Sequence, residues 1–363
     1  MKLSDVCTKG TSNIAQKDLD ARNGAYPIYG ASGFIKNVDF YHQEKPYIAI
    51  VKDGAGVGRV MQLPAKSSVI GTMQYIIPNE GVSVEYLAYA LEHMNLSKYY
   101  LGAAIPHIYF KDYCSETLPN HTPEEQTNIS HVLGLVSNLI FLRKQQLSKL
   151  DEIVRSRFIE MFENGNFPLV KAEDVCEFIT KGTTPPTGEI YTEFGDNRIP
   201  YLKVYNLSFD GSLLFDCAPQ YIDKSVHNGN LSRSKVYPND VLMNIVGPPL
   251  GKFSLVTSAF AEWNINQAIS IFRAKNNVLP RFLLSALMQP TVLEPFLKQA
   301  VGVRQLNISL EQCRNIQFPL PPIELQAEFV AFAEQTDKSK VTVQKSLEKL
   351  ETLKKALMQQ YFG

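Results

Sequence analysis

Lysines, arginines, asparagines and threonines stand next to glycines and prolines in several predicted turns of this 363-residue chain. Such side chains suit nucleic acid, because Lys and Arg contact phosphates, Asn and Gln bind adenine edges, and Arg binds guanine. The candidate DNA-binding residues of the first half are Lys36, Lys52, Arg59, Lys66, His107 and Tyr109. Those of the second half are Lys181, Thr183, Thr184, Lys203, Asn206, Lys252, Asn264, Asn266, Arg304, Gln305 and Asn307. Taken singly, each Lys or Arg is more often a solvated surface charge.

The sequence lacks the motifs of the common catalytic classes. The six histidines form no HExxH pair, and there is no Walker loop and no GxSxG serine. An Asn-Pro-Pro-Tyr-type loop, with which amino-methyltransferases hold a flipped base, is also missing. The five cysteines form no CxxC pair, which argues against a disulfide framework or a thiolate zinc site. We therefore expect no catalytic residue, no metal and no cofactor in this chain.

Residues 52–58, Lys-Asp-Gly-Ala-Gly-Val-Gly, admit a dinucleotide-binding interpretation. A dinucleotide turn must open a helix whose N-terminus meets the pyrophosphate. Leu63 and Pro64 instead limit the following run to the length of a strand, and residues 47–51 before it form a compact apolar run. The pattern favours a glycine-rich hairpin turn. An enzyme with a nucleotide at residues 54–58 stays the weaker alternative.

The elements that must position these side chains occur twice, with an offset of 200 residues. Residues 123–162 predict a long helix with an apolar seam at Ile129, Val132, Val136, Leu139, Leu147, Leu150, Val154 and Met161. Adding 200 gives a second helix of the same phase, and Glu124 and Gln126 correspond to Glu324 and Gln326. Helices of about 40 residues are roughly 60 Å long, too long for one small domain. The repeat predicts two antiparallel helices packed as a coiled coil.

A mixed segment precedes each helix, which predicts an α+β fold with two repeated recognition domains. We place these domains at residues 1–120 and 166–320, and the helical segments at 121–165 and 321–363. Residues 2–7 and 171–176 both end in Asp-Val-Cys, and residues 102–108 correspond to 302–308. In this correspondence Arg304, Gln305 and Asn307 stand where the first copy has His107 and Tyr109. Two scaffolds of one kind are therefore expected to carry two different recognition surfaces.

The charges of the chain are balanced, with 36 Lys and Arg against 36 Asp and Glu. A nucleic-acid surface must then be local, or shared with a more basic partner. No run approaches the ~18 apolar residues of a membrane span, and the first ten residues contain no apolar signal core. We expect a cytoplasmic protein.

Several of these motifs, in their order and duplication, resemble the specificity subunits of type I restriction-modification systems. They are residues 26–33 and 52–58 in the first copy, and 181–185, 199–201, 264–269 and 318–326 in the second. The resemblance covers essentially the whole chain. It implies a non-catalytic protein with two target recognition domains, each of which reads half of a split DNA sequence. It also implies two antiparallel helices whose length sets the number of unread base pairs between the two halves.

The resemblance also implies the partners of the chain. These are double-stranded DNA and two methyltransferase subunits, which supply the S-adenosylmethionine site and methylate adenine. The resemblance also allows two motor-nuclease subunits in the complex. A different class of function stays open from the residues alone: a protein-binding scaffold whose paired helices dock partners and whose two mixed domains bind peptides.

Overall fold

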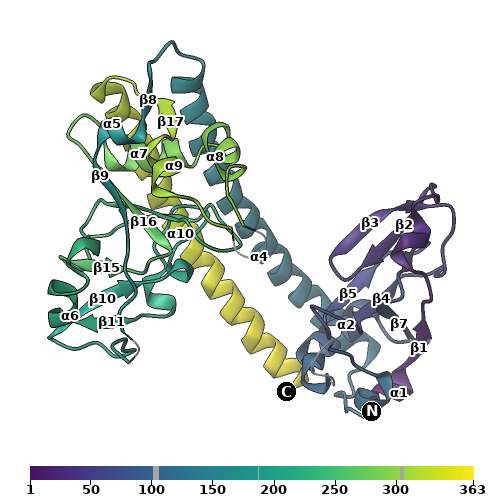
Figure 1. The fold of residues 1–363 in the computed structure, drawn as a ribbon. Helices are drawn as coiled ribbons and strands as arrows, with labels where there is room; N and C mark the ends of the chain where they lie inside the picture. The colour runs from purple at the N-terminus through teal and green to yellow at the C-terminus, as the bar shows by residue number, and fades with distance from the viewer. Residues whose placement is uncertain (101–105, 187, 303–305) are drawn as a thin grey trace. The chain divides into compact units, whose positions relative to one another are not determined.

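The computed structural model describes residues 1–100, 106–186, 188–302 and 306–363. The chain divides into two compact units, the first formed by residues 1–145 with 344–363 and the second by residues 146–343. Each unit contains a mixed domain of strands and short helices together with parts of both long helices (Figure 1). None of the helices in the described ranges has both the length and the apolar character required to cross a bilayer.

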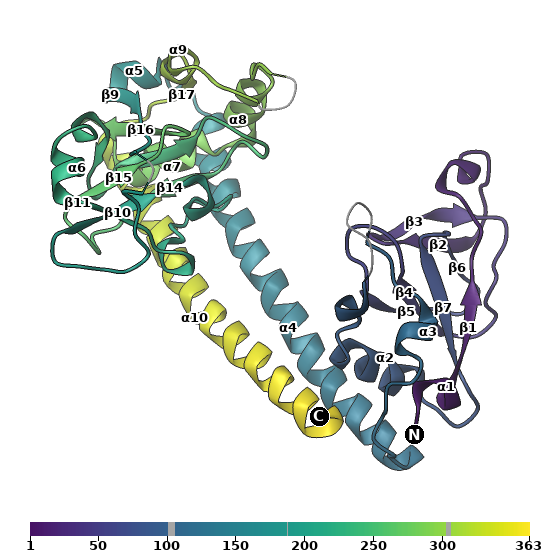
Figure 2. The same cartoon turned by 60° about the horizontal axis from the view of Figure 1, so that its bottom comes forward.

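The first unit is built around an antiparallel sheet. Its elements are α1 (Leu3–Val6), β1 (Cys7–Thr11), η1 (Gln16–Leu19), β2 (Tyr26–Gly30), β3 (Gly33–Val38), β4 (Tyr47–Val51), β5 (Val60–Leu63), β6 (Ser68–Val69), β7 (Met73–Pro78), α2 (Val84–His93), η2 (Leu96–Tyr99) and α3 (Phe110–Tyr113). The main sheet has the order β1-β7-β4-β5, and α2 lies beside β4 and β5 (Figure 2). In a second sheet, β3-β2-β6, strands β2 and β6 are parallel. Strand β4 is apolar and buried along its whole length, as a central strand should be.

The second unit repeats this topology. Its elements are β8 (Leu169–Lys171), α5 (Ala172–Val175), β9 (Cys176–Lys181), β10 (Arg198–Leu202), η4 (Val204–Asn206), η5 (Phe215–Cys217), β11 (Tyr221–Asp223), α6 (Lys224–Asn228), η6 (Ser232–Ser234), β12 (Lys235–Val236), β13 (Val241–Asn244), β14 (Phe253–Leu255), β15 (Trp263–Ile265), β16 (Ile269–Ala274), α7 (Pro280–Leu287), α8 (Pro290–Leu297), α9 (Leu310–Arg314) and β17 (Gln317–Pro319). The sheet β9-β16-β13-β14 corresponds to β1-β7-β4-β5. In the sheet β11-β10-β15-β12, strands β10 and β15 are parallel, as β2 and β6 are. The predicted duplication and α+β class are confirmed.

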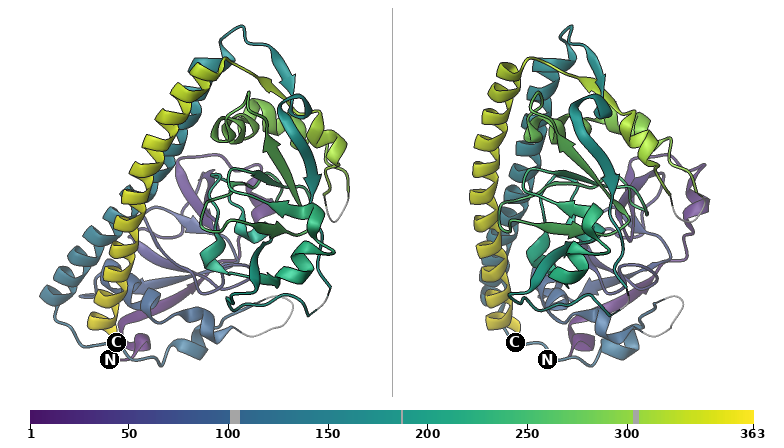
Figure 3. Two further views of the ribbon diagram at one scale, coloured as in Figure 1. Left: turned by 90° about the vertical axis from the view of Figure 1, so that its left-hand side faces the viewer. Right: turned by 60° about the vertical axis from the view of Figure 1, so that its left-hand side comes forward.

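Both predicted long helices form. Helix α4 (Pro123–Phe158) continues into a π-helical turn, η3 (Ile159–Glu163), and α10 (Ile323–Phe362) is unbroken (Figure 3). The start of α4 is fixed by reciprocal bonds, because the Thr122 amide donates to the Glu125 carboxylate at 2.7 Å and the Glu125 amide donates to Thr122 Oγ1 at 3.3 Å. Of the predicted seam, Leu139 is 44% exposed, and Leu133, which was not predicted, is fully buried instead.

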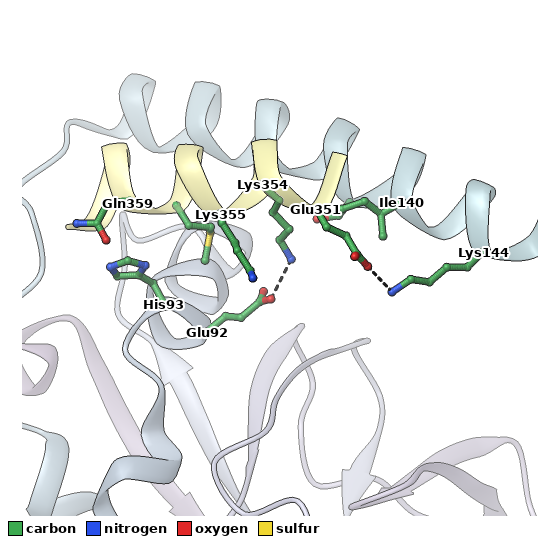
Figure 4. Close-up of a pocket in the computed structure, with 10 residues that line it drawn as sticks. Glu92, His93, Ile140, Lys144, Glu351, Lys354, Lys355 and Gln359 are labelled. Atoms are coloured by element: carbon green, nitrogen blue, oxygen red, sulfur yellow. Dashed lines mark hydrogen bonds and ion pairs between the residues drawn. The ribbon is translucent and has the colours of Figure 1, made fainter. Parts of the chain in front are cut away.

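The helices run antiparallel in each unit. In the first unit Ile129 packs in one apolar group with Met358, and Lys144 forms an ion pair with Glu351 at 3.0 Å (Figure 4). In the second unit the ion pairs are Asp151 with Lys340 at 2.6 Å and Arg157 with Glu328 at 3.0 Å. Rising numbers on α4 thus meet falling numbers on α10, as predicted.

A buried glutamine in the first turn of each long helix binds backbone of the preceding domain. Gln126 Oε1 accepts from the Ser83 amide at 3.2 Å, and Gln326 Oε1 accepts from the Leu279 amide at 2.9 Å. Nε2 of each donates to the carbonyl five residues earlier, at 3.0 and 2.9 Å. Ser83 and Leu279 are the N-cap residues of α2 and α7. The corresponding glutamines thus attach corresponding short helices to α4 and α10.

The far ends of the helices also occupy corresponding places. Phe162, beyond α4, lies in the second unit with its ring centroid 5.2 Å from that of Phe282 on α7. Phe362, at the end of α10, lies in the first unit 5.3 Å from Tyr86 on α2. Tyr86 and Phe282 are each the third residue after their N-cap. Each helix therefore ends on the domain of the other repeat.

Replacement of Gln326 by Leu is expected to destabilise the second unit by about 2 kcal/mol, because the Leu279 amide and two carbonyls lose their buried partner. Denaturant unfolding followed by the fluorescence of Trp263, the only tryptophan, measures the change. Gln335→Leu, at an exposed position of α10, is the matched control. Equal shifts in the two variants would contradict a structural role for the buried amide.

Candidate nucleic-acid interface

The glycine-rich residues 54–58 form the turn between β4 and β5, which pair as antiparallel neighbours. Gly54, Gly56 and Gly58 have φ of +82°, +91° and +85°, a region that L side chains rarely adopt. A Cβ on Gly58 would lie 2.5 Å from the Ser97 amide nitrogen, so this glycine also permits close packing against η2. A strand follows the turn, whereas a dinucleotide turn must open a helix. The hairpin prediction is confirmed.

A second segment, residues 106–108, is bonded along this turn. The Gly54 amide donates to the Pro106 carbonyl at 2.9 Å, and the Ile108 amide donates to the Lys52 carbonyl at 3.0 Å. Asp53 and His107 face each other as an isolated antiparallel bridge. The predicted residues Lys52 and His107 are therefore brought together by backbone bonds, although 54 positions separate Asp53 from His107 in the chain.

The second unit has the same arrangement. The Gly247 amide donates to the Leu306 carbonyl at 3.0 Å, the Ile308 amide donates to the Ile245 carbonyl at 2.9 Å, and Val246 bridges Asn307. Asn307 is thus the counterpart of His107, as the offset of 200 predicted. Arg304 and Gln305, also predicted here, lie outside the described residues.

Aromatic and basic side chains surround His107 in the first unit. The exposed ring of Tyr109 lies 4.1 Å from the imidazole, measured between centroids, and Lys111 Nζ lies 5.3 Å from the centre of the Tyr109 ring. Lys52 Nζ is 3.9 Å from Asp53 Oδ2. Asp53 and Lys111 were not predicted; the signal for Asp53 was its place directly after Lys52 in the turn.

The remaining predicted residues of the first unit have protein partners of their own. Arg59 donates to the Ala31 carbonyl at 2.8 Å while its side chain stays exposed. Lys66, at φ +52°, is exposed and 4.0 Å from Glu44. Lys36 is half-buried, and its Nζ donates to the Leu19 carbonyl and to Asn23 at 3.0 and 3.1 Å. Of these three, Lys36 is the least available to a ligand.

In the second unit, residues 181–184 gather next to residues 265–266. The Thr183 amide donates to the Ile265 carbonyl at 3.2 Å, and a Cβ on Gly182 would lie 2.1 Å from the Asn266 carbonyl oxygen. Arg233 Nε donates to Thr183 Oγ1 at 3.1 Å. Lys181 and Thr184 are exposed at this place, and Asn266 is half-buried. The predicted residues of this group therefore lie together, and Arg233 is bonded to one of them, Thr183.

Two predicted residues are corrected by their burial. Asn206 is fully buried, where its amide donates to the Leu214 carbonyl at 3.2 Å and its oxygen accepts from the Lys203 amide at 2.9 Å. Asn264 is fully buried and donates to the Leu231 carbonyl at 3.1 Å and to His227 Nδ1 at 3.0 Å. Both side-chain amides form hydrogen bonds in the protein interior and are not available to DNA. The side chains of Lys203 and Lys252 are half-exposed, and Lys252 Nζ lies 5.7 Å from the Phe209 ring.

The chain is similar in sequence to known proteins. A family model described as the type I restriction modification DNA specificity domain matches residues 1–152 and again residues 164–354. The MjaVIII specificity subunit, a type I restriction enzyme subunit of Methanocaldococcus jannaschii, is 23% identical over 349 residues, which cover 90% of this chain and 81% of that protein. The type I restriction enzyme EcoBI specificity subunit of Escherichia coli is 32% identical over 106 residues, 28% of this chain and 22% of that protein.

Two solved structures have a similar fold. The S subunit of a type I restriction-modification system from M. genitalium gives a TM-score of 0.55 at 14% identity, with 100% of this chain and 95% of that chain covered. A structure described as the basis of complex assembly and conformational transition of a type I R-M system gives 0.52 at 16% identity, with 99% and 96% covered.

The buried His227 predicts a pH-dependent stability of the second unit. Burial, followed by the charge of Lys235, lowers the pKa of His227, and these effects exceed the opposing effect of Glu262. The neutral ring is the form seen in the structure, because its Nδ1 accepts from the Asn264 amide. The unfolded chain then binds a proton at this histidine at a higher pH than the folded chain does. Stability is present above the unfolded histidine pKa of ~6.5 and is lost as pH falls below it.

We expect the denaturant midpoint of Trp263 fluorescence to fall between pH 7 and pH 5, and the fall to be smaller in His227→Gln. His131→Gln, at an exposed position of α4, is the control and should keep the wild-type profile. An unchanged profile in His227→Gln would show that other groups cause the fall.

Proposed function

The chain belongs to the type I restriction-modification DNA specificity family, and we infer from this that it is the subunit that selects the DNA sequence. It recognises a bipartite target, with one half-site for each recognition domain, and directs a partner adenine methyltransferase to that target. The chain itself is non-catalytic. The relatives are specificity subunits of restriction enzymes. In this proposal, a restriction subunit that joins the complex is therefore directed to the same DNA target as the methyltransferase.

The observation that carries this function is the repeated backbone frame with unlike side chains. The same pair of backbone bonds holds His107 next to the first glycine turn and Asn307 next to the second. An imidazole and an amide offer different hydrogen-bonding groups to base edges. A common scaffold with different reading groups is what two unlike half-sites require.

We propose that DNA contacts come from predicted residues that keep exposed or half-exposed side chains. In the first unit they are Lys52, Arg59, Lys66, His107 and Tyr109. In the second they are Lys181, Thr183, Thr184, Lys203, Lys252, Asn266 and Asn307. The lysines and Arg59 suit phosphates, and the amide, hydroxyl and imidazole groups suit base edges.

The partners complete the chemistry that this chain lacks. We propose two methyltransferase subunits for each chain, with S-adenosylmethionine bound to them, and two motor-nuclease subunits in the restricting complex. The zero net charge agrees with a DNA surface shared with partners. A cytoplasmic location is part of the same proposal.

A peptide-binding scaffold is the alternative, and the family does not favour it. The two are distinguished by salt, since phosphate contacts make DNA affinity fall steeply as salt rises. If the affinity of the chain for its partner changes neither with salt nor with competing DNA, the scaffold is supported.

The experiment that tests the function is methylation mapping. The chain is expressed with its methyltransferase partner in a host without other adenine methylation, and modified adenines are located by sequencing the genome. We expect a split motif with a fixed gap. Modification without a split motif, or none from an assembled complex, would contradict the proposal.

We propose that the two long helices set the gap between the half-sites. Insertion of one heptad before Leu147 and one before Leu347, at equivalent points of the repeat, keeps the phase of the seam. Seven residues add ~10 Å of helix, about three base pairs of B-DNA. We expect methylation mapping to return both half-sites unchanged and a gap longer by about three base pairs.

A single insertion, before Leu147 only, is the control for the heptad experiment, because it leaves the two helices unequal in length and should lower methylation. If the double insertion changes the half-sites and not the gap, the helices take part in base recognition.

A further inference from the structure

The side chains of Asp53 and His107 are hydrogen-bonded to each other at the centre of the first candidate site. His107 Nδ1 contacts Asp53 Oδ1, and Lys52 Nζ lies 3.9 Å from the other carboxylate oxygen. The backbone bonds of Lys52 and Gly54 to residues 106 and 108 fix both partners. The side chains of His107 and Asp53 remain 26% and 29% exposed, so the pair is neither sealed in the interior nor free in solvent.

The second copy shows that the backbone frame does not require the Asp53–His107 pair. Val246 stands at the position of Asp53 and Asn307 at that of His107, with the same backbone bonds. The frame therefore forms without an Asp–His pair. Within one chain, the carboxylate accompanies the imidazole, and an apolar residue accompanies the amide.

This pairing follows from the chemistry of the two reading groups. An asparagine amide always presents both a donor and an acceptor. A neutral imidazole has one of each, and which nitrogen carries the proton is set by the partner of the other nitrogen. A carboxylate at Nδ1 keeps the proton there and makes Nε2 the nitrogen that meets a ligand. A valine cannot do this, and an asparagine does not require it.

We propose that His107 is a base-reading residue of the first recognition domain, that Asp53 is its positioning residue, and that Asn307 is the reading counterpart in the second domain. The inference rests on the proposed function. With the proton held on Nδ1, Nε2 accepts from the exocyclic amine of adenine or cytosine. Tyr109, against the imidazole, limits how the ring can turn.

The test uses the full chain assembled with its methyltransferase partner and a DNA library randomised at the first half-site, with the second half-site kept constant. Bound DNA is sequenced for wild type and for Asp53→Val, His107→Asn and the double variant, which imports both residues of the second copy. Asp39→Val makes the same chemical change at an exposed ion pair with Arg22 in the same unit and is the matched control.

In Asp53→Val, discrimination at one base of the first half-site should fall by a factor of about ten or more, because a well-placed base contact contributes that much. His107→Asn and the double variant should prefer a different base at that position. Asp39→Val and the constant half-site should be unaffected. Thermal unfolding checks that each variant is folded. If Asp53→Val does not fold, the result for His107→Asn decides the test.

An unchanged preference at every position in folded His107→Asn overturns the inference while the proposed function stands. An equal loss of affinity for all sequences in Asp53→Val shows a structural role only, which also overturns it. If the wild-type complex has no sequence preference at either half-site, the proposed function fails and this inference fails with it.

Discussion

A buried glutamine side chain joins each recognition domain to the long helix that follows it, and the geometry of both units depends on this bond. The N-cap amides of α2 and α7 have no partner within their helices, and the buried side chains of Gln126 and Gln326 supply one. An unpaired buried amide costs about 1–3 kcal/mol, which is a large part of the stability of a domain. The bond also has a direction, and it therefore fixes how the sheet-bearing domain lies on the helix.

The aromatic ends of the helices complete this attachment. Phe162 closes on Phe282 and Phe362 closes on Tyr86, so each compact unit takes the beginning of one long helix and the end of the other. Phe162 is fully buried and Phe362 is partly buried. Complete burial of a phenylalanine contributes roughly 1.5–3 kcal/mol, comparable with the glutamine bond. The consequence is that neither repeat is complete alone: the domain of one repeat needs the helix end of the other to cover its apolar face.

The duplication made the helices, the sheets and the correspondence of His107 with Asn307 predictable, because an offset of 200 residues transfers an expectation from one copy to the other. Burial was not predictable in the same way. Asn264 offers the groups that bind adenine, and the same groups bind the Leu231 carbonyl and His227 inside the second unit. The pairing of β15 with β10, more than 60 positions earlier in the chain, and with β12 on its other side places Asn264 in the interior. Asp53 was overlooked for the opposite reason: a carboxylate repels phosphate, and its use becomes apparent only beside His107.

The two candidate sites differ in side chains because their frame is held by backbone atoms. The bonds from Gly54 and Ile108, and from Gly247 and Ile308, involve amides and carbonyls that every residue other than proline possesses. The side chains at 107 and 307 take no part in them, so a change there leaves the frame intact. Glycines at positive φ and the buried apolar strands before each turn are under a different constraint, because they build the frame itself. A scaffold of this kind separates stability from sequence preference, so new half-sites can arise from single exposed residues without repacking a core.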